Sequence, residues 1–114
     1  MTNAAHSEIE LSVVIPLYNE EGNLRPLHEA LAAALPKTGQ RFEIILVNDG
    51  SRDDTEEILA EIAAADPTVR PINLRRNFGQ TAAIMAGLDH ARGDVIVPLD
   101  GDLQNDPEDI PALL

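Results

Sequence analysis

Two aspartates that follow an apolar segment are the residues with the clearest capacity for chemistry. Asp100 and Asp102 come directly after the apolar run 95–99, and Gln104 follows two residues later. Carboxylate and amide oxygens are ligands that Mg²⁺ and Mn²⁺ prefer, and a cation held at a strand end can meet a phosphate group there. The spacing predicts a cation site with Asp102 as the stronger ligand, although Asp-Gly is also a common turn pair.

The net charge makes such a cation necessary for binding a phosphate. The 114-residue chain has 8 Lys+Arg against 20 Asp+Glu, which gives a formal net charge of −12. A bare diphosphate would be repelled, and a divalent cation removes that repulsion. The same balance argues against nucleic acid and anionic membrane surfaces as direct partners, because both require clustered Lys and Arg.

A second carboxylate, Asp49, follows the apolar run 42–47 and precedes Gly50 and Ser51. One interpretation is a turn residue. The other is a carboxylate that accepts the ring N–H of uracil or guanine, the directional contact that a nucleobase pocket needs. Tyr18, the only tyrosine, follows another apolar run and could stack on a base or simply cover the end of a sheet.

The only basic cluster begins at Arg75 and Arg76 and precedes a predicted helix. It is either solvated surface charge or a phosphate or sugar contact beside a helix N-terminus, where backbone N–H groups attract anions. The three histidines are scattered, at positions 6, 28 and 90. We assign them to a tail, a helix surface and a helix end.

Apolar residues with strand-like and helix-like spacing alternate along the chain. Continuous β-branched runs predict buried strands, and leucines three and four residues apart predict a helix. The predicted strands are 11–16, 42–47, 69–74 and 95–99. The predicted helices are 24–35, a segment opening with the capping-box pattern Asp53-x-x-Glu56, residues 80–91 with Ile84 and Leu88 facing inward, and a segment opening at Asp106.

Four alternations of strand and helix with short connections are typical of a parallel α/β sheet. Right-handed crossovers give the strand order 3-2-1-4, which leaves the third strand at an edge, as Pro71 requires. Strands 1 and 4 then flank the point where the order reverses, and ligands of open α/β sheets bind beyond the strand ends at such a point. The turn 16–19 and the segment 100–102 would meet there.

We expect one domain over residues 10–114, preceded by a disordered tail of residues 1–9. The last helix has barely begun at Leu114, so we expect this domain to be the N-terminal part of a larger one, truncated at its C-terminus. The sequence shows no signal peptide, and no apolar run reaches the roughly 20 residues of a membrane span. A cytoplasmic location is therefore expected.

Five segments, in the same order, resemble family 2 glycosyltransferases of the GT-A fold. They are Val14-Ile-Pro-Leu-Tyr-Asn-Glu-Glu21, Val47-Asn-Asp-Gly-Ser51, Arg76-Asn-Phe-Gly-Gln80, Ala83-Ile-Met-Ala-Gly87 and Leu99-Asp-Gly-Asp-Leu-Gln104. Within this family the chain most resembles the polyprenyl-phosphate sugar transferases. These include dolichol-phosphate mannose synthase-like enzymes and the bacterial undecaprenyl-phosphate glucose and aminoarabinose transferases.

The resemblance implies a Rossmann-like GT-A half that binds a nucleotide sugar, and it implies a role for each matching residue. The nucleotide pocket would be lined by Pro16, Tyr18, Glu20, Asp49 and Asp100, with Asp49 on the base. The catalytic pair Asp100 and Asp102, with Gln104, would bind the diphosphate and Mg²⁺ or Mn²⁺. Arg76 would contact a phosphate or sugar.

The implied reaction is metal-dependent, inverting transfer of a sugar from a UDP- or GDP-linked donor to a polyprenyl phosphate, undecaprenyl or dolichyl. A lipid phosphate is already ionised at neutral pH, so no general base is required. The resemblance also implies that the lipid acceptor is bound by a C-terminal half, at the cytoplasmic face of the membrane.

Two other functions stay open. Haloacid-dehalogenase-type, Mg²⁺-dependent phosphatases also place Asp-x-Asp after an apolar strand, with the first aspartate, here Asp100, as nucleophile. In that family the motif usually begins the domain and carries Thr or Val where this chain has Gln104. The second alternative is a non-catalytic fragment that binds nucleotide without turnover.

Overall fold

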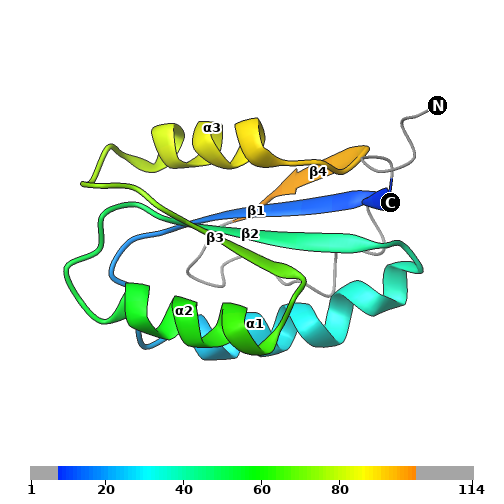
Figure 1. The fold of residues 1–114 in the computed structure, drawn as a ribbon, viewed down its shortest axis with the longest axis horizontal. Helices are drawn as coiled ribbons and strands as arrows, with labels where there is room; N and C mark the ends of the chain where they lie inside the picture. Colours follow the sequence, from blue (N-terminus) through cyan, green and yellow to red (C-terminus); the bar gives the residue numbers. More distant parts are fainter. Residues whose placement is uncertain (1–7, 100–114) are drawn as a thin grey trace.

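The computed structural model describes residues 8–99, which form a parallel sheet with helices on both faces (Figure 1). The strands are β1 (Leu11–Leu17), β2 (Phe42–Asn48), β3 (Val69–Asn73) and β4 (Val95–Pro98). The helices are α1 (Leu24–Ala34), followed by the 3₁₀ turn η3 (Leu35–Thr38), then α2 (Thr55–Ala65) and α3 (Gln80–His90). The candidate residues Asp100, Asp102 and Gln104, the helix predicted from Asp106, and tail residues 1–7 lie outside the described residues.

The strand order is β3-β2-β1-β4, with all neighbours parallel, so the predicted topology is confirmed. Pro71 lies in β3 at the edge of the sheet, where its missing N–H leaves no ladder bond unmade. The register pairs Leu17 with Asn48, so β1 and β2 end at the same level. The loops that follow these two strands therefore begin side by side.

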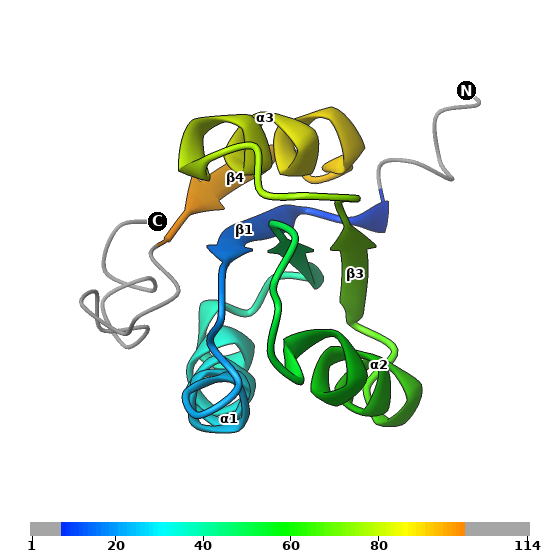
Figure 2. The same cartoon turned by 90° about the vertical axis from the view of Figure 1, so that its left-hand side faces the viewer.

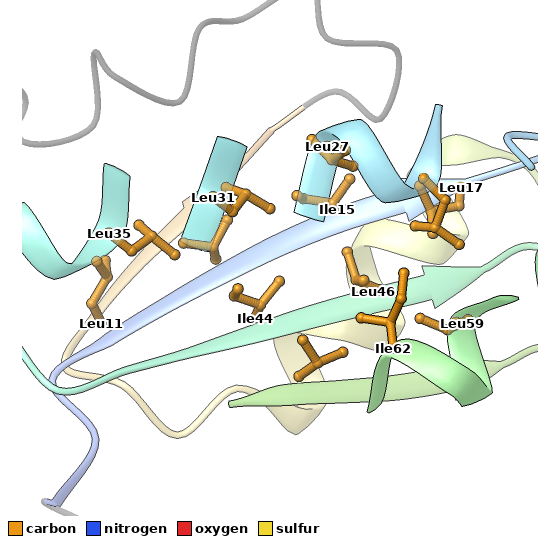
Figure 3. Close-up of a cluster of buried hydrophobic side chains, with 13 residues drawn as sticks. Leu11, Ile15, Leu17, Leu27, Leu31, Leu35, Ile44, Leu46, Leu59 and Ile62 are labelled. Atoms are coloured by element: carbon orange, nitrogen blue, oxygen red, sulfur yellow. The ribbon is translucent and has the colours of Figure 1, made fainter. Parts of the chain in front are cut away.

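The larger core lies between the sheet and helices α1 and α2, which pack on the same face (Figures 2 and 3). Every residue of β1 is buried, because β1 is central and covered on both faces. The leucines of α1 point at the sheet with helical spacing, as predicted. The core side chains labelled in Figure 3 are Leu11, Ile15, Leu17, Leu27, Leu31, Leu35, Ile44, Leu46, Leu59 and Ile62.

Among residues 8–99, α3 is the one helix on the other face, and its inward residues differ in part from the prediction. Ala83 and Gly87 are the buried residues of α3. Leu88 is half-buried and packs against the core on this face, as predicted, whereas Ile84 is only half-buried. A Cβ on Gly87 would overlap the side chain of Val14 in β1. Small residues therefore let α3 approach the sheet more closely than a stripe of large aliphatic side chains would allow.

Helix α2 begins one residue later than the expected capping box predicts. Its N-cap is Asp54, which makes no side-chain cap hydrogen bond. The carboxylate of Asp53 instead accepts from the backbone N–H of Thr55 at 2.9 Å and from the Thr55 hydroxyl. No helix among residues 8–99 is long and apolar enough to cross a membrane.

Candidate functional site

The loops that follow β1 and β2 are joined to each other by reciprocal hydrogen bonds. The Asn19 N–H donates to Ser51 Oγ at 2.9 Å, and the Arg52 N–H donates to Asn19 Oδ1 at 2.8 Å. Asn19 has a φ of 53°, in the left-handed region that asparagine tolerates better than most residues. This pair of bonds holds the first strand tip against the second.

A second pair of bonds continues the junction toward α2. The Glu20 N–H donates to Thr55 Oγ1 at 3.0 Å, and the Glu21 N–H donates to Asp53 Oδ2 at 3.3 Å. Burial raises the pKa of Asp53, but hydrogen bonds from Thr55 and Glu21 outweigh it, so the pKa lies below its ordinary value. Asp53 is thus a charged structural acceptor at the start of α2.

Asp49 lies at the end of β2 and is 3% exposed. Its Oδ1 accepts from the Phe78 N–H at 2.8 Å. Its Oδ2 accepts from the Gly79 N–H at 3.0 Å and from Asn77 Nδ2 at 3.2 Å. Asp49 therefore fixes the segment that leads into α3, and these three partners of its carboxylate are uncharged N–H donors.

Gly50 makes this arrangement possible. It has a φ of 71°, and a Cβ at this position would overlap the backbone of Arg76 and Asn77. The segment 75–79 therefore lies directly on the Asp49–Gly50 turn. Sequence reasoning singled out both segments but did not predict that they contact each other.

The other predicted nucleotide residues border this junction in different ways. Pro16 is buried within β1 and paired with Val47, so it shapes the strand end without an exposed surface. Glu20 is half-buried and its Oε1 accepts from Asn23 Nδ2 at 3.0 Å. Tyr18 is 42% exposed beyond the end of β1, so its ring is accessible for stacking rather than covered by the fold.

Arg76 lies over an aromatic ring at the same end of the sheet. Its guanidinium carbon is 4.8 Å from the centroid of the Phe78 ring, a cation–π distance. Phe78 is 49% exposed. The arginine head group is therefore placed by an aromatic support and stays at the surface, where it can meet an anion.

The predicted metal ligands Asp100, Asp102 and Gln104 lie outside the described residues. Among residues 8–99, no three His, Cys, Asp or Glu side chains come close enough to hold a metal ion. His28 Nε2 lies 2.7 Å from Asp66 Oδ2, and His90 Nδ1 lies 2.9 Å from the carbonyl oxygen of Ala86. The described histidines thus have structural partners.

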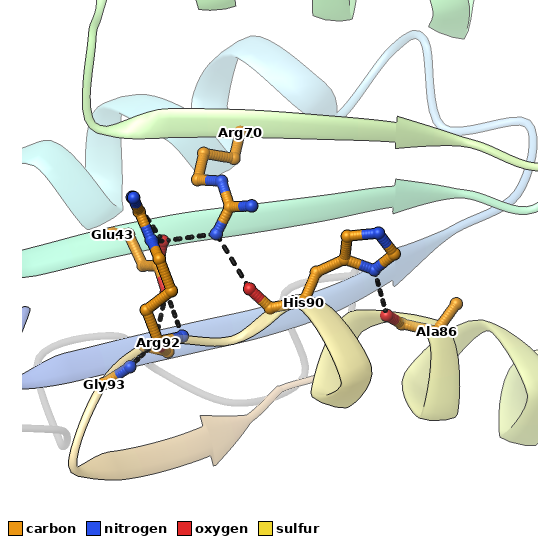
Figure 4. Close-up of polar contacts among 7 residues, drawn as sticks. Glu43, Arg70, Ala86, His90, Arg92 and Gly93 are labelled. Atoms are coloured by element: carbon orange, nitrogen blue, oxygen red, sulfur yellow. Dashed lines mark hydrogen bonds and ion pairs between the residues drawn. The ribbon is translucent and has the colours of Figure 1, made fainter. Parts of the chain in front are cut away.

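A buried ionic cluster at the opposite end of the sheet was not predicted (Figure 4). Glu43 in β2 accepts from the Ser12 hydroxyl at 2.6 Å, from Arg70 Nη1 at 2.8 Å and from the Arg92 N–H at 2.8 Å. The Gly93 N–H donates to Ser12 Oγ at 2.8 Å. Burial raises the pKa of Glu43, but these hydrogen bonds outweigh it and hold the pKa below its ordinary value.

Comparison with known proteins assigns this chain to a family. The family model "Glycosyl transferase family 2" matches residues 12–114. The dodecaprenyl-phosphate galacturonate synthase of Rhizobium johnstonii is 47% identical over 114 residues, which are 99% of this chain and 34% of that protein. The chain therefore spans about a third of the length of this curated relative.

Two solved structures have the same fold. S. aureus TarS 1–349 in complex with UDP-GlcNAc aligns with a TM-score of 0.71 and 30% identity, covering 82% of this chain and 27% of that one. The mannosyltransferase PcManGT from Pyrobaculum calidifontis, in complex with GDP-Man and Mn²⁺, aligns with a TM-score of 0.74 and 22% identity. This alignment also covers 82% of this chain and 27% of that one. The expected GT-A architecture is thereby confirmed.

Proposed function

Because this chain belongs to glycosyl transferase family 2, we propose that it binds the nucleoside diphosphate of a sugar donor whose sugar is transferred to a polyprenyl phosphate. The similar structures hold UDP-GlcNAc or GDP-Man, and the Rhizobium relative is named for a dodecaprenyl phosphate. These names support the two substrate classes, a nucleotide sugar and a lipid phosphate.

The observation that carries the proposal is the Asp49 carboxylate. It is fixed where three loops converge, at the sheet end where ligands of open α/β sheets bind, and its partners Asn77, Phe78 and Gly79 are neutral donors. A carboxylate is an acceptor only, so it selects bases that present an N–H, such as uracil and guanine. Adenine and cytosine present a ring nitrogen acceptor at the corresponding position and would be rejected.

Two exposed groups beside Asp49 would hold the rest of the nucleotide. Tyr18, a residue 42% exposed, would stack its ring on the base. The Arg76 guanidinium, supported by the Phe78 ring, would contact the diphosphate or the sugar. Glu20 and Pro16 would shape the wall of the pocket at the end of β1.

The acidic segment after β4 would complete the donor site. Asp100, Asp102 and Gln104 offer oxygen ligands, the donor set that suits Mg²⁺ or Mn²⁺. Such a cation, when bound, would stabilise the negative charge that develops on the leaving diphosphate. PcManGT was solved with Mn²⁺, which supports the same requirement here.

An ionised lipid phosphate would attack the anomeric carbon of the donor sugar directly, displace the nucleoside diphosphate and invert the configuration at that carbon. This chain's residues would then need only to hold and orient the donor. The acceptor would be bound by the part of the protein that the relatives have and this chain does not cover. A lipid acceptor places the reaction at a membrane surface, which we propose to be the cytoplasmic face.

Calorimetry of nucleotide binding tests this proposal. We expect the chain to bind UDP or GDP in the presence of Mn²⁺ and to lose most of that affinity in EDTA. Asp102→Ala should weaken Mn²⁺-dependent binding more than Gln104→Ala, because a carboxylate contributes charge and an amide does not. Equal affinity with Mn²⁺ and with EDTA would contradict the metal requirement, and absence of all nucleotide binding would contradict the proposal itself.

A further inference from the structure

The Asp49 carboxylate has a limited number of places for a ligand. An ionised carboxylate offers about four acceptor positions, two on each oxygen. On Oδ2 both are taken, by the Gly79 N–H at 3.0 Å and by Asn77 Nδ2 at 3.2 Å. On Oδ1 one is taken, by the Phe78 N–H at 2.8 Å. Counted over donors from residues 8–99, a single acceptor position therefore remains, and it is on Oδ1.

We infer that Asn77 is a positioning residue that determines base specificity: by occupying Oδ2, it limits Asp49 to one N–H of the bound base. This inference rests on the proposed function. Uracil in a nucleotide has one ring N–H and matches one acceptor position. Guanine presents two adjacent donors, the ring N–H and the exocyclic amine, and needs both oxygens of a carboxylate. The arrangement therefore favours a uridine nucleotide over a guanosine nucleotide.

Of the three hydrogen-bond donors to the Asp49 carboxylate, the Asn77 amide is the one that a side-chain substitution can remove. The donors from Phe78 and Gly79 are backbone N–H groups at the start of α3, so substitution of those side chains leaves them in place. The Asn77 amide also donates to the Asp49 carbonyl oxygen at 3.3 Å. Its nitrogen thus bridges the backbone and the carboxylate of the same residue, which fixes the rotation of the carboxylate.

A purely structural role for Asn77 makes a different prediction. If Asn77 only anchored the loop, its loss would weaken all nucleotides by the same factor. If it occupies Oδ2, its loss opens one acceptor position, which only a base with a second donor can use. The ratio of two affinities, rather than either affinity alone, separates the two roles.

The test compares GDP with inosine diphosphate (IDP), which lacks only the exocyclic amine, by calorimetry with Mn²⁺ and the full chain. In the unchanged chain we expect GDP and IDP to bind within about twofold of each other, and UDP to bind more tightly than both. In Asn77→Ala we expect the affinity for GDP to rise relative to the affinity for IDP by about three- to tenfold, the range for one additional hydrogen bond. The preference for UDP over GDP should become smaller in this variant.

Asn73→Ala is the matched control, because Asn73 Oδ1 accepts from Asn48 Nδ2 at 3.0 Å at the end of the neighbouring strands. It should leave the GDP-to-IDP ratio unchanged. A strong GDP preference over IDP in the unchanged chain would overturn the inference even if Asn77→Ala does not fold, and so would an unchanged ratio in Asn77→Ala. Absence of binding by every nucleotide would instead overturn the proposed function, and this inference with it.

Discussion

A buried carboxylate lies at each end of strand β2, Glu43 within it and Asp49 directly after it, and the two are satisfied in opposite ways. Glu43, 1% exposed, is held by the side chains of Arg70 and Arg92, at 2.8 and 3.1 Å, and by the Ser12 hydroxyl. Asp49, 3% exposed, is held by two backbone N–H groups and one amide. One carboxylate is neutralised by cations, and the other is surrounded by dipoles.

This difference distinguishes a structural end of the sheet from the end that we propose to bind the nucleotide, here called the binding end. Two arginines cancel the Glu43 charge and use its oxygens, so nothing is left for a ligand. Neutral donors orient the Asp49 carboxylate, and two of them are backbone N–H groups at the N-terminus of α3, with no arginine or lysine among these partners. The contrast teaches that the partners of a buried acid, rather than its burial, indicate whether it can recognise a ligand.

Gly50→Ala should produce the largest effect, at the binding end. The substitution combines a φ of 71° with overlap against the Arg76 backbone, which no side-chain rotation relieves. We expect the free energy of unfolding to fall by about 2–5 kcal/mol and nucleotide binding to be lost. Gly39→Ala is the matched control, because Gly39 has the same φ of 71° with no atom within 4 Å of its Cβ. Urea denaturation measures both; equal losses would refute the close approach.

Glu43→Gln should have the next largest effect, at the structural end. The amide cannot accept from both arginines with the strength of a carboxylate, so we expect the free energy of unfolding to fall by about 1.5–3 kcal/mol. Nucleotide affinity of the folded protein should not change. Glu61→Gln is the control, because Glu61 pairs with Arg25 at the surface and should change stability by less than about 1 kcal/mol. A comparable loss in both variants would show that burial of Glu43 adds nothing.

The stabilisation that ionised Glu43 provides should be lost gradually as the pH falls. Its pKa in the folded protein lies below the ordinary value of 4.5, so the stabilisation is present above pH 4.5 and is lost as the pH falls through the lowered value. The difference in unfolding free energy between the unchanged chain and Glu43→Gln should therefore be constant near neutral pH and shrink below about pH 4.5. Urea titrations at several pH values measure it, and a difference that grows toward acid would contradict the ion-pair explanation.

The topology could be read from the sequence, whereas the contacts inside each end of the sheet could not. The strand order and the edge position of Pro71 follow from local patterns and from the handedness of crossovers. Of the inward residues of α3, Leu88 was predicted and packs against the core, but Ala83 and Gly87 were missed, because amphipathic spacing favours large side chains while close packing on Val14 requires small ones. Small buried residues carry no hydrophobic signal of their own.

Long-range polar pairs were missed for a different reason. Glu43 meets Arg70 and Arg92, which are 27 and 49 positions away, and Asp49 meets Asn77, which is 28 positions away. Only the strand register decides which of many charged residues come together. An isolated glutamate inside an apolar strand and two arginines at element ends were the available signals, and each is common on its own.

Arg76→Gln should produce the smallest change in stability and the sharpest change in ligand preference. The cation–π contact with Phe78 is exposed, so its loss should cost about 0.5–1 kcal/mol of unfolding free energy. If Arg76 contacts the diphosphate, the affinity for UDP should fall by about tenfold or more while the affinity for uridine stays the same, because uridine carries no phosphate. Arg75→Gln is the matched control, since it removes the same charge from the adjacent position. Calorimetry with both ligands separates a specific contact from the general attraction between an arginine and an anion. Equal losses of UDP affinity in the two variants would show that only net charge matters. Nucleotide binding would then rely on Asp49 and the acidic segment after β4, without a specific contact from Arg76.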